Sequence, residues 1–427
     1  MDIVVKHGQK LMGRVKAPPS KSHSQRAIAA SLLLDTSRIE NRGFSDDENA
    51  CVEILRSIGC EVNEQGHELY IQNRFQFDKN VHIDCHESGF CARLFAAFMM
   101  FNTAETHILG RGTLLQRPMT PIQSIYDQLG ICYTWNQGLL PITIRGNRVQ
   151  KDLEIDGSLS SQFISGILYY LVGQELKKTI RLTVYNPKSV PYINMTTSFL
   201  NSLGADIHWK TENVLEIQPS ILKKNAEIVV EGCWSSASFW LVAAAINGEI
   251  TLEGLDPSSE QADRAVLNVL TNFGAEVDIT ESRVFVKSSE NKSFQFDATD
   301  CPDLIPIVSV LAVFAEGEST IYGVDRLKYK ESDRLSGIIC ILNSLKIKTE
   351  VCEKFVKISG SKQLLKSVQR LDNHIFNSQN DHRLAMASTI LAQNLCAAMI
   401  VDAQSIDKSY PNFYKDFQSL GGQIEEI

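Results

Sequence analysis

The chain has 427 residues, of which 44% are hydrophobic and 22% are charged, so it is long enough for two or three globular domains. Its formal net charge of −8 excludes a general attraction for nucleic acid or an anionic membrane surface, so any anion must bind locally. The ten cysteines include no Cys-x-x-Cys pair and no apolar run approaches the roughly 18 residues of a membrane span, which together predict a cytoplasmic protein without disulfides.

The chain starts with two strand-like segments, Asp2–Val5 and Met12–Lys16, that belong to no repeat. After them a unit of about 70 residues recurs six times. Each unit has an apolar helix, a second helix closed by glycine, and two short strands. The apolar helices are Ala27–Leu34, Leu94–Phe101, Phe163–Leu171, Phe239–Ile246, Leu304–Phe314 and Leu384–Ala392. The second helices end at Gly59, Gly130, Gly204, Gly274, Lys346 and Gly421, which are 70 to 75 residues apart.

Glycine suits the end of a helix because that position commonly requires a positive φ, and Lys346 is a degenerate copy of the pattern. The strands that follow alternate apolar and polar residues, as half-exposed strands do. The apolar helices have no polar face, so we expect them to be buried.

One such unit cannot enclose its own buried helix, and six units exceed what a single core usually holds, so we predict two domains of three units each. The sixth unit ends after a single strand, and the two N-terminal strands are expected to complete its domain. This predicts a discontinuous domain of residues 1–19 and 232–427, a second domain of residues 20–231, and a hinge where the chain crosses twice. The alternative is an elongated solenoid, but the sequence shows no evident end caps.

Polar residues gather at the starts of the six apolar helices, where free backbone N–H groups and the helix dipole favour anions. For any one start, an N-cap is the simpler explanation, because Ser and Asp are favoured caps. A basic residue there opposes the dipole, so Lys21, Arg26 and Arg383 indicate bound anions. The six starts are Ser20–Arg26, Ser88–Arg93, Ser160–Gln162, Ser235–Ser236, Pro302–Asp303 and Asp381–Arg383.

Two further basic clusters, Gln116–Pro121 and Lys328–Arg334, precede helices of the second kind. Within the second cluster, Glu331 and Arg334 could simply pair on one helix face. A carboxylate among three cations could also carry a proton.

Other patterns in the sequence do not indicate a function. The segment Gly110-Arg111-Gly112 has Leu115 where a dinucleotide fingerprint requires glycine, and the chain contains no P-loop. His82, Asp84 and His86 alternate along a predicted strand and could in principle share a metal, but the same spacing arises on any polar strand face. We expect no metal and no cofactor.

Five motifs occur in the order found in the 5-enolpyruvylshikimate-3-phosphate synthase family, and the chain resembles that family from Lys16 to Pro411. The motifs are Pro19-Ser20-Lys21-Ser22-x-Ser24-x-Arg26, Ser160-Ser161-Gln162, Lys330-Glu331-Ser332-Asp333-Arg334, Asn380-Asp381-His382-Arg383 and Lys408-Ser409-Tyr410-Pro411. The resemblance implies an α/β fold of two similar domains, each with three βαβαββ repeats around buried parallel helices, known as an inverse α/β barrel, with the active site in the cleft between the domains.

The resemblance also implies the reaction: transfer of the enolpyruvyl group of phosphoenolpyruvate to the 5-hydroxyl of shikimate 3-phosphate, with release of phosphate, in the pathway to chorismate and aromatic amino acids. The implied contacts to phosphoenolpyruvate are Lys21, Gly89, Arg117, Gln162, Arg334, Arg383 and Lys408. The implied contacts to shikimate 3-phosphate are Lys21, Ser22, Arg26, Ser160, Ser161, Gln162, Ser189, Asp303 and Lys330.

Both substrates are polyanions, and arginine forks fit phosphate and carboxylate bidentately. In the implied assignment Asp303 and Glu331 handle protons, and Lys21 stabilises the phosphate and shares in proton transfer. The chain departs from the common family pattern at five positions, none of them assigned to catalysis: Glu87, Ser88, Phe90, Leu94 and Arg326.

Three other functions are compatible with parts of the pattern. The sister UDP-N-acetylglucosamine enolpyruvyl transferases typically have Lys-Asn in place of Lys21-Ser22, and a non-catalytic binding subunit would not need Lys21, Asp303 and Glu331 together. An RNA-end-modifying enzyme would need a basic face, whereas this chain has 50 acidic and 42 basic residues. We therefore expect small-molecule substrates, a monomer, and neither nucleic acid nor membrane as a partner.

Overall fold

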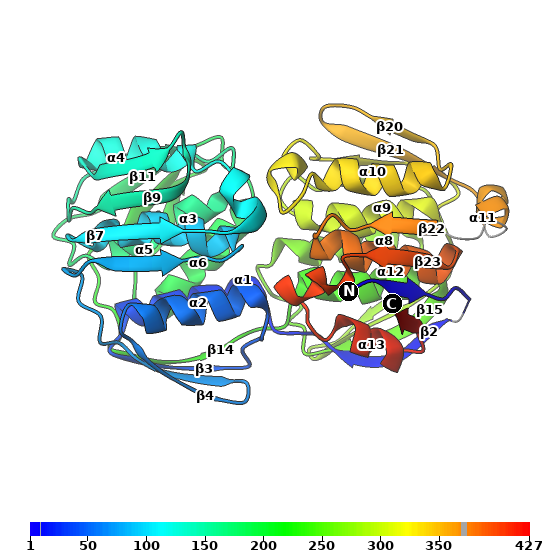
Figure 1. Cartoon of the computed structure of the whole chain (residues 1–427), viewed down its shortest axis with the longest axis horizontal. Helices are drawn as coiled ribbons and strands as arrows, with labels where there is room; N and C mark the ends of the chain where they lie inside the picture. Colours follow the sequence, from blue (N-terminus) through cyan, green and yellow to red (C-terminus); the bar gives the residue numbers. More distant parts are fainter. Residues whose placement is uncertain (9, 369–373) are drawn as a thin grey trace. The chain divides into compact units, whose positions relative to one another are not determined.

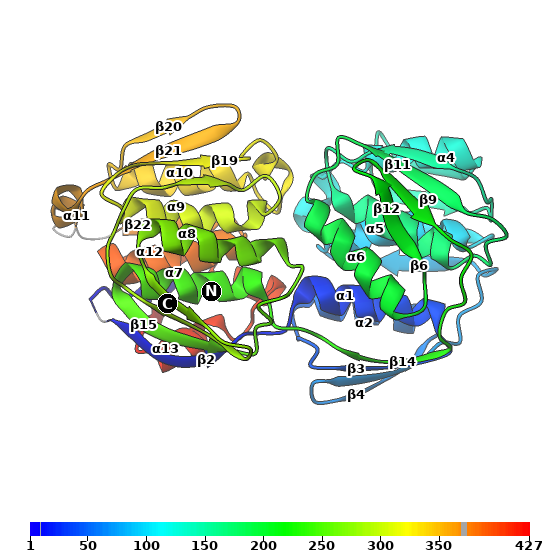
Figure 2. The ribbon, with the colours of Figure 1, turned by 180° about the vertical axis from the view of Figure 1, so that it is seen from behind.

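The computed structural model describes residues 1–8, 10–368 and 374–427. The chain forms two compact units (Figures 1 and 2): residues Pro19–Val230, here called the middle unit, and residues Met1–Pro18 with Glu231–Ile427, here called the end unit. The ten cysteines are all unpaired. Among the helices of the described residues, none is long and apolar enough to cross a membrane.

The middle unit contains three four-stranded sheets built on one plan. In each sheet, a parallel pair at one edge is followed by two antiparallel pairings. In order across the sheets, the strands are β14 (Asn225–Val229), β3 (Thr36–Glu40), β5 (Glu68–Gln72) and β4 (Glu61–Gln65); β6 (Val81–Asp84), β7 (Glu105–Leu109), β9 (Leu139–Arg145) and β8 (Cys132–Asn136); and β10 (Leu153–Asp156), β11 (Ile180–Tyr185), β13 (Val214–Ile217) and β12 (Ile207–Thr211).

The end unit repeats the plan in three more sheets. Their strands are β2 (Leu11–Lys16), β15 (Gly248–Glu253), β17 (Arg283–Lys287) and β16 (Glu276–Ile279); β18 (Gln295–Asp297), β19 (Gly317–Tyr322), β21 (Phe355–Gly360) and β20 (Thr349–Val351); and β22 (His374–Asn377), β23 (Ala398–Val401), β1 (Ile3–Val5) and β24 (Ile424–Glu426). The N-terminal strand β1 lies inside the last sheet, antiparallel to both β23 and β24.

Six apolar helices fill the two cores. They are α1 (Lys21–Ala30), α3 (Gly89–Phe98) and α5 (Ser161–Val172) in the middle unit, and α7 (Trp234–Asn247), α9 (Ile305–Val313) and α12 (His382–Leu395) in the end unit. Every residue of α3 and α9 is buried. Four of the six cross over between the parallel strands of one sheet, as parallel pairing requires. For the other two, the parallel pairs are β14 with β3, from opposite ends of the middle unit's sequence, and β2 with β15, from the two segments of the end unit.

The second helix of each repeat ends in a left-handed residue at the predicted position. These helices are α2 (Asp46–Ser57), α4 (Gln123–Leu129), α6 (Val190–Ser202), α8 (Val266–Phe273), α10 (Arg334–Ser344) and α13 (Phe413–Ser419). The φ angles of the five glycines range from 65° at Gly130 to 104° at Gly204, and Lys346 has a φ of 59°. The predicted repeat is therefore confirmed, including its degenerate copy. One helix outside the pattern, α11 (Lys362–Val368), was not predicted.

Candidate active site

The buried helices of the middle unit begin at serine N-caps. Ser20 Oγ accepts the His23 N–H at 3.4 Å, and Ser88 Oγ accepts the Cys91 N–H at the same distance. Ser160 Oγ accepts the Gln162 N–H at 3.3 Å. The N-cap explanation is therefore correct for these three serines, and any anion at these helix starts must also be recognised by the neighbouring basic residues.

Lys21 is the first residue of α1, and its ammonium group forms an ion pair with a carboxylate from the next helix. Its Nζ lies 2.7 Å from Oδ2 of Asp47, which is in the first turn of α2, and the two side chains are 17% and 13% exposed. A capping box of Ser45 and Glu48 fixes the start of α2 and therefore the place of Asp47. An anion that binds at the start of α1 would compete with Asp47 for the lysine.

Arg117 lies directly against the start of α3. A Cβ atom added to Gly89, the first residue of α3, would stand 2.8 Å from an Arg117 guanidinium nitrogen. Arg117 is 5% exposed and donates to Thr113 Oγ1 at 3.3 Å. A side chain at position 89 would require the guanidinium to move, so glycine lets this cation lie against the first turn of α3, where backbone N–H groups also favour an anion.

Arg26 is almost completely buried below the start of α1. Its guanidinium donates to Thr196 Oγ1 at 2.8 Å, to the Ser22 carbonyl at 2.7 Å and to the Tyr192 carbonyl at 3.1 Å. It also lies 4.8 Å from the centre of the Phe90 ring. The contacts of Arg26 with Thr196 and Tyr192 tie α1 to α6, so this predicted site residue has a packing role in the structure as well.

Two more predicted residues of the middle unit lie at helix starts. Gln162 accepts a hydrogen bond of 2.9 Å from Arg93, which joins α5 to α3. Ser189, the N-cap of α6, is buried and has a left-handed φ of 53°. Such a conformation is strained for a residue with a side chain and often marks a functional position.

His23 lies beside these residues but carries no proton at neutral pH. Burial and the nearby Arg26 lower the pKa of His23 to about 4. Its ring meets the edge of Phe199, with 5.5 Å between the ring centres. His23 is therefore a neutral packing residue in the first turn of α1.

A second cluster, in the end unit, is built around Arg334, the first residue of α10. Arg334 is 1% exposed and binds three carboxylates. It donates to Asp381 Oδ2 at 2.7 Å, to Asp303 Oδ1 at 2.7 Å and to Glu331 Oε2. The predicted pairing of Glu331 with Arg334 is thus present, but it is one part of a larger network.

Asp303 binds three cations from two segments of the end unit. Besides Arg334, it binds Lys330 at 3.1 Å and Arg383 at 3.1 Å. Burial alone would raise the pKa of Asp303, but Arg383, Lys330 and Arg334 outweigh it and hold the pKa well below its usual range. Burial lowers the pKa of Lys330, and Asp303 opposes that shift. Asp303 is therefore an ionised acceptor.

The start of α12 completes this cluster. Asp381 is its N-cap and accepts the Arg383 N–H at 2.9 Å, while the Arg383 guanidinium reaches Asp303. Lys408 donates to the Asn380 carbonyl at 2.9 Å, one residue before the cap. Lys330, Arg334 and Arg383 balance Asp303, Glu331 and Asp381 in formal charge. An incoming anion that binds Lys330, Arg334 or Arg383 must share these cations with the carboxylates, whereas Lys408 donates to a backbone carbonyl.

Comparison with known proteins identifies the family. The family profile described as EPSP synthase (3-phosphoshikimate 1-carboxyvinyltransferase) matches residues 5–417. The chain belongs to this family. A relative named 3-phosphoshikimate 1-carboxyvinyltransferase from Clostridium kluyveri is 33% identical, with 98% of this chain and 97% of that protein covered. One of the same name from Clostridium acetobutylicum is 34% identical, covering 97% of this chain and 96% of that protein.

Solved structures show the same fold. An EPSP synthase from Acinetobacter baumannii matches with a TM-score of 0.81 at 22% identity, over 100% of both chains. The enolpyruvyl transferase NikO from Streptomyces tendae matches with a TM-score of 0.75 at 16% identity, over 99% of this chain and 98% of that chain. The predicted family and fold class are confirmed.

The departures from the common EPSP synthase pattern have visible packing roles. Phe90 packs under the Arg26 guanidinium, and Leu94 is fully buried in α3. Arg326 donates to the Thr299 carbonyl, and burial lowers its pKa. The carboxylate of Glu87 occupies the space beside Gly112.

Of the candidate metal ligands, His82 and Asp84 lie on β6 and His86 lies beyond its end, and the three have separate partners. His82 stacks on His107 with ring centres 4.5 Å apart, Asp84 pairs with Arg111, and His86 lies 3.1 Å from Glu53. Within residues 1–8, 10–368 and 374–427, no group of three or more His, Cys, Asp or Glu side chains could hold a metal ion.

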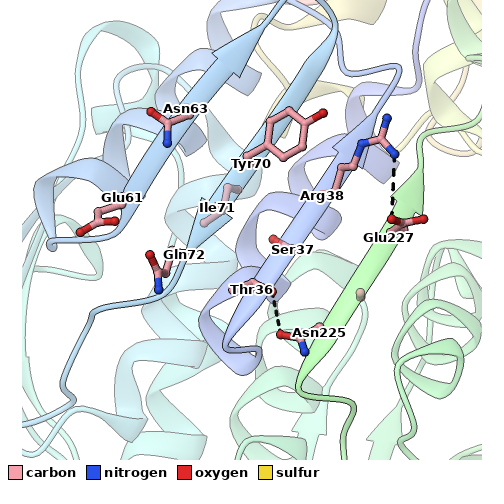
Figure 3. A pocket seen from close by; sticks show the side chains of 11 residues that line it. Thr36, Ser37, Arg38, Glu61, Asn63, Tyr70, Ile71, Gln72, Asn225 and Glu227 are labelled. Atoms are coloured by element: carbon pink, nitrogen blue, oxygen red, sulfur yellow. Dashed lines mark hydrogen bonds and ion pairs between the residues drawn. The ribbon is translucent and has the colours of Figure 1, made fainter.

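A groove of about 580 Å³ lies on the exposed face of the first sheet (Figure 3). Thr36 and Arg38 line it from β3, Tyr70 from β5 and Glu227 from β14. Arg38 is held there by Glu68 at 3.0 Å and by Glu40 at 2.9 Å. Among the described residues that line the groove, none belongs to the predicted site.

Two residues that hold the site, Asp47 and Gln25, are not marked as site residues by the sequence. Asp47 is one of three acidic residues in succession that begin α2. Gln25 lies inside the predicted helix start Ser20–Arg26, but its amide carries no charge. Only the folded chain shows that both contact the starts of other helices.

Proposed function

We propose that the chain transfers the enolpyruvyl group of phosphoenolpyruvate to the 5-hydroxyl of shikimate 3-phosphate and releases phosphate. The observation that carries this proposal is the match to the EPSP synthase family over residues 5–417. The basic helix starts of both units support it, because both substrates are polyanions. The product leads to chorismate and the aromatic amino acids.

Most of the predicted site residues contact one of the two substrates. Phosphoenolpyruvate is bound by Lys21, Gly89, Arg117, Gln162, Arg334, Arg383 and Lys408. Shikimate 3-phosphate is bound by Lys21, Ser22, Arg26, Ser160, Ser161, Gln162, Ser189, Asp303 and Lys330. Lys21 and Gln162 therefore contact both, and the two clusters serve a single reaction.

The end-unit cluster supplies the proton chemistry. Asp303 accepts the proton of the 5-hydroxyl as its oxygen bonds to C2 of the enol, and Glu331 delivers a proton to the methylene carbon, which becomes a methyl group. Lys21 stabilises the phosphate. Glu331 then takes a proton back from the methyl group, which expels phosphate and restores the double bond. Neither a covalent enzyme intermediate nor a cofactor takes part.

The ion pairs of Asp303 indicate how substrate binding makes the Asp303 carboxylate more basic. In the described state three cations lower the pKa of Asp303, which makes it a weak base. When phosphoenolpyruvate takes up Arg334 and Arg383, these cations interact less with Asp303. The pKa of Asp303 then rises toward its ordinary range, and the carboxylate becomes a better proton acceptor.

Phosphate release tests the proposed function. The protein is mixed with shikimate 3-phosphate and phosphoenolpyruvate, with each substrate alone as a control and with a chelator in a parallel sample. Phosphate is expected only when both substrates are present, and equally with and without the chelator. No release from the complete mixture would refute the enzyme and favour a binding protein on the same fold.

We also propose that the enzyme works as a cytoplasmic monomer without nucleic acid or membrane partners. Ten unpaired cysteines suit a reducing compartment, and the net charge of −8 opposes binding to polyanionic surfaces. Sedimentation of the active enzyme at several concentrations would reveal any dimer.

A further inference from the structure

Gln25 is a buried amide on α1 that contacts two other helices of the middle unit. Its side chain is 1% exposed. The Nε2 group donates to the Asp47 carbonyl at 3.0 Å and to Ser88 Oγ at 2.9 Å, and it lies 3.3 Å from Cys91 Sγ. One NH₂ group from α1 thus reaches the first turn of α2 and the first turn of α3.

The partners of Gln25 are direct neighbours of predicted substrate contacts. Asp47, whose carbonyl accepts from Gln25, binds Lys21 through its carboxylate. Ser88 is the N-cap of α3 and precedes Gly89, against which Arg117 lies. The amide therefore sets the separation between the ammonium group of Lys21 and the backbone N–H groups of α3.

From this geometry we infer that Gln25 is a positioning residue for phosphoenolpyruvate, acting through Asp47 and Ser88. The inference rests on the proposed function. The Lys21 ammonium group, the α3 backbone and the Arg117 guanidinium can hold one anion only at a fixed spacing, and an error of about 1 Å in such a spacing is enough to weaken catalysis strongly. Shikimate 3-phosphate depends less on Gln25, because it shares only Lys21 with this group, whereas Gly89 on α3 and Arg117 beside it contact phosphoenolpyruvate alone.

The test compares Gln25→Met with a matched control, Gln174→Met. Methionine has a similar length but cannot donate, so it removes one donor from the Asp47 carbonyl and one from Ser88 Oγ. Gln174 is also a buried glutamine of the middle unit, and it donates to the Tyr170 carbonyl at 3.3 Å just beyond the end of α5. We expect Gln25→Met to raise the KM for phosphoenolpyruvate by roughly 3- to 30-fold, the effect of losing one or two hydrogen bonds, with the KM for shikimate 3-phosphate within about twofold. Gln174→Met should change neither constant.

A double-mutant cycle with Ser88→Ala shows whether Gln25 acts through the α3 cap. If it does, the two substitutions together should raise the KM for phosphoenolpyruvate less than the product of their separate effects. Melting temperatures of all variants separate this from simple loss of stability, which would lower the melting temperature and leave both KM values unchanged.

Three results would overturn the inference: unchanged KM values in Gln25→Met, an equal rise for both substrates, or full additivity with Ser88→Ala. The wild-type protein is assayed first. If it releases no phosphate, the proposed function has failed; if it turns over and Gln25→Met behaves like Gln174→Met, only the inference about Gln25 has failed.

Discussion

Arg334 is fully buried and binds three carboxylates from different segments of the end unit. A buried ion network of this kind is vulnerable to the loss of one member, because the remaining charge is left uncompensated. Glu331 is the partner of Arg334 that the proposed mechanism also assigns to proton transfer. Substitution at Glu331 therefore has to distinguish a proton carrier from an anchor for arginine.

Glu331→Gln should lower turnover by about 10²–10⁴-fold, because it keeps the shape of the side chain and removes the group that delivers the proton. Binding of phosphoenolpyruvate should change far less. Single-turnover kinetics measure the chemical step, and titration calorimetry measures binding.

The control for Glu331 is Glu249→Gln, which breaks an exposed pair with Lys287 at 3.3 Å in the same unit and should leave turnover unchanged. A different combination of binding and rate would assign Glu331 another role. If binding collapses in Glu331→Gln while the single-turnover rate survives, Glu331 serves only to hold Arg334.

Acid should destabilise the protein partly through His23. Its pKa is about 4 in the folded state, against an ordinary value of 6.5 that the unfolded chain would show, so the unfolded state binds the extra proton more readily. The contribution to stability is complete above pH 6.5 and falls as the pH drops from 6.5 to 4. The lost free energy of unfolding amounts to about 3 kcal/mol at full effect.

His23→Gln removes this titration and should make the free energy of unfolding less dependent on pH between 6.5 and 4. Urea denaturation at several pH values measures the effect. His208, which is half exposed and carries no comparable burial, provides the matched variant His208→Gln. Identical pH slopes in wild type and His23→Gln would mean that His23 keeps its ordinary pKa in the folded protein.

Parts of the candidate site were predictable from the sequence, namely those in which the interacting groups are close together along the chain. Lys21 and Arg383 oppose a helix dipole, and Glu331 precedes Arg334 by three residues, so both features can be read from neighbouring positions. The convergence of Asp303 and Asp381 on Arg334 could not be predicted, because pairs 31 and 47 residues apart depend on tertiary packing. The link from Gln25 to Ser88 spans 63 residues and is hidden for the same reason.

At the scale of elements, one of the six second helices ends in a different residue type from the others. Five second helices close on glycine, whereas α10 closes with Lys346 at a φ of 59°. The closing hydrogen bonds are nevertheless formed: the Lys346 N–H donates to the Asn343 carbonyl at 2.9 Å, and the Ile347 N–H donates to the Leu342 carbonyl at 3.1 Å. A side chain in this conformation is strained, since Cβ approaches its own carbonyl oxygen.

Lys346→Gly should therefore stabilise the protein, by about 0.5–1 kcal/mol once the greater flexibility of glycine in the unfolded chain is counted. Lys346 is exposed, so little packing is lost. The control is Lys348→Gly, at an exposed position nearby without positive φ, which should destabilise the protein by a similar amount. Thermal unfolding measures both, and a loss of stability in Lys346→Gly would show that the lysine is not strained.

At the scale of the whole molecule, the repeat length and the buried helices were predictable because hydrophobic periodicity marks them directly. The pairing of β14 with β3 was harder to predict, because β14 precedes α7 in the chain in the same way that β6 precedes α3. Strand order alone would place β14 beside β15, the strand after α7. The parallel partner of β15 is instead β2, so the two sheets next to the chain crossings are each completed by a strand distant in sequence.

Strand β1 shows how the end unit depends on residues from the far end of the chain. Ile3 is fully buried, and β1 pairs with β23 on one side and β24 on the other. Ile3→Ala should lower the free energy of unfolding by about 2–5 kcal/mol, because it removes buried methyl groups and leaves a cavity. The damage should be confined to the unit whose core contains Ile3.

Hydrogen exchange read by mass spectrometry can localise that damage. Ile3→Ala should increase exchange in β22, β23, β24 and α12, with no change between Pro19 and Val230. The matched variant is Ile39→Ala, at a fully buried position of β3 in the other core, and it should give the opposite pattern. This follows because each unit has its own hydrophobic core and opens as a cooperative region. If either variant raised exchange equally in both units, the two cores would have to unfold together. The two compact units would then not be independently stable regions.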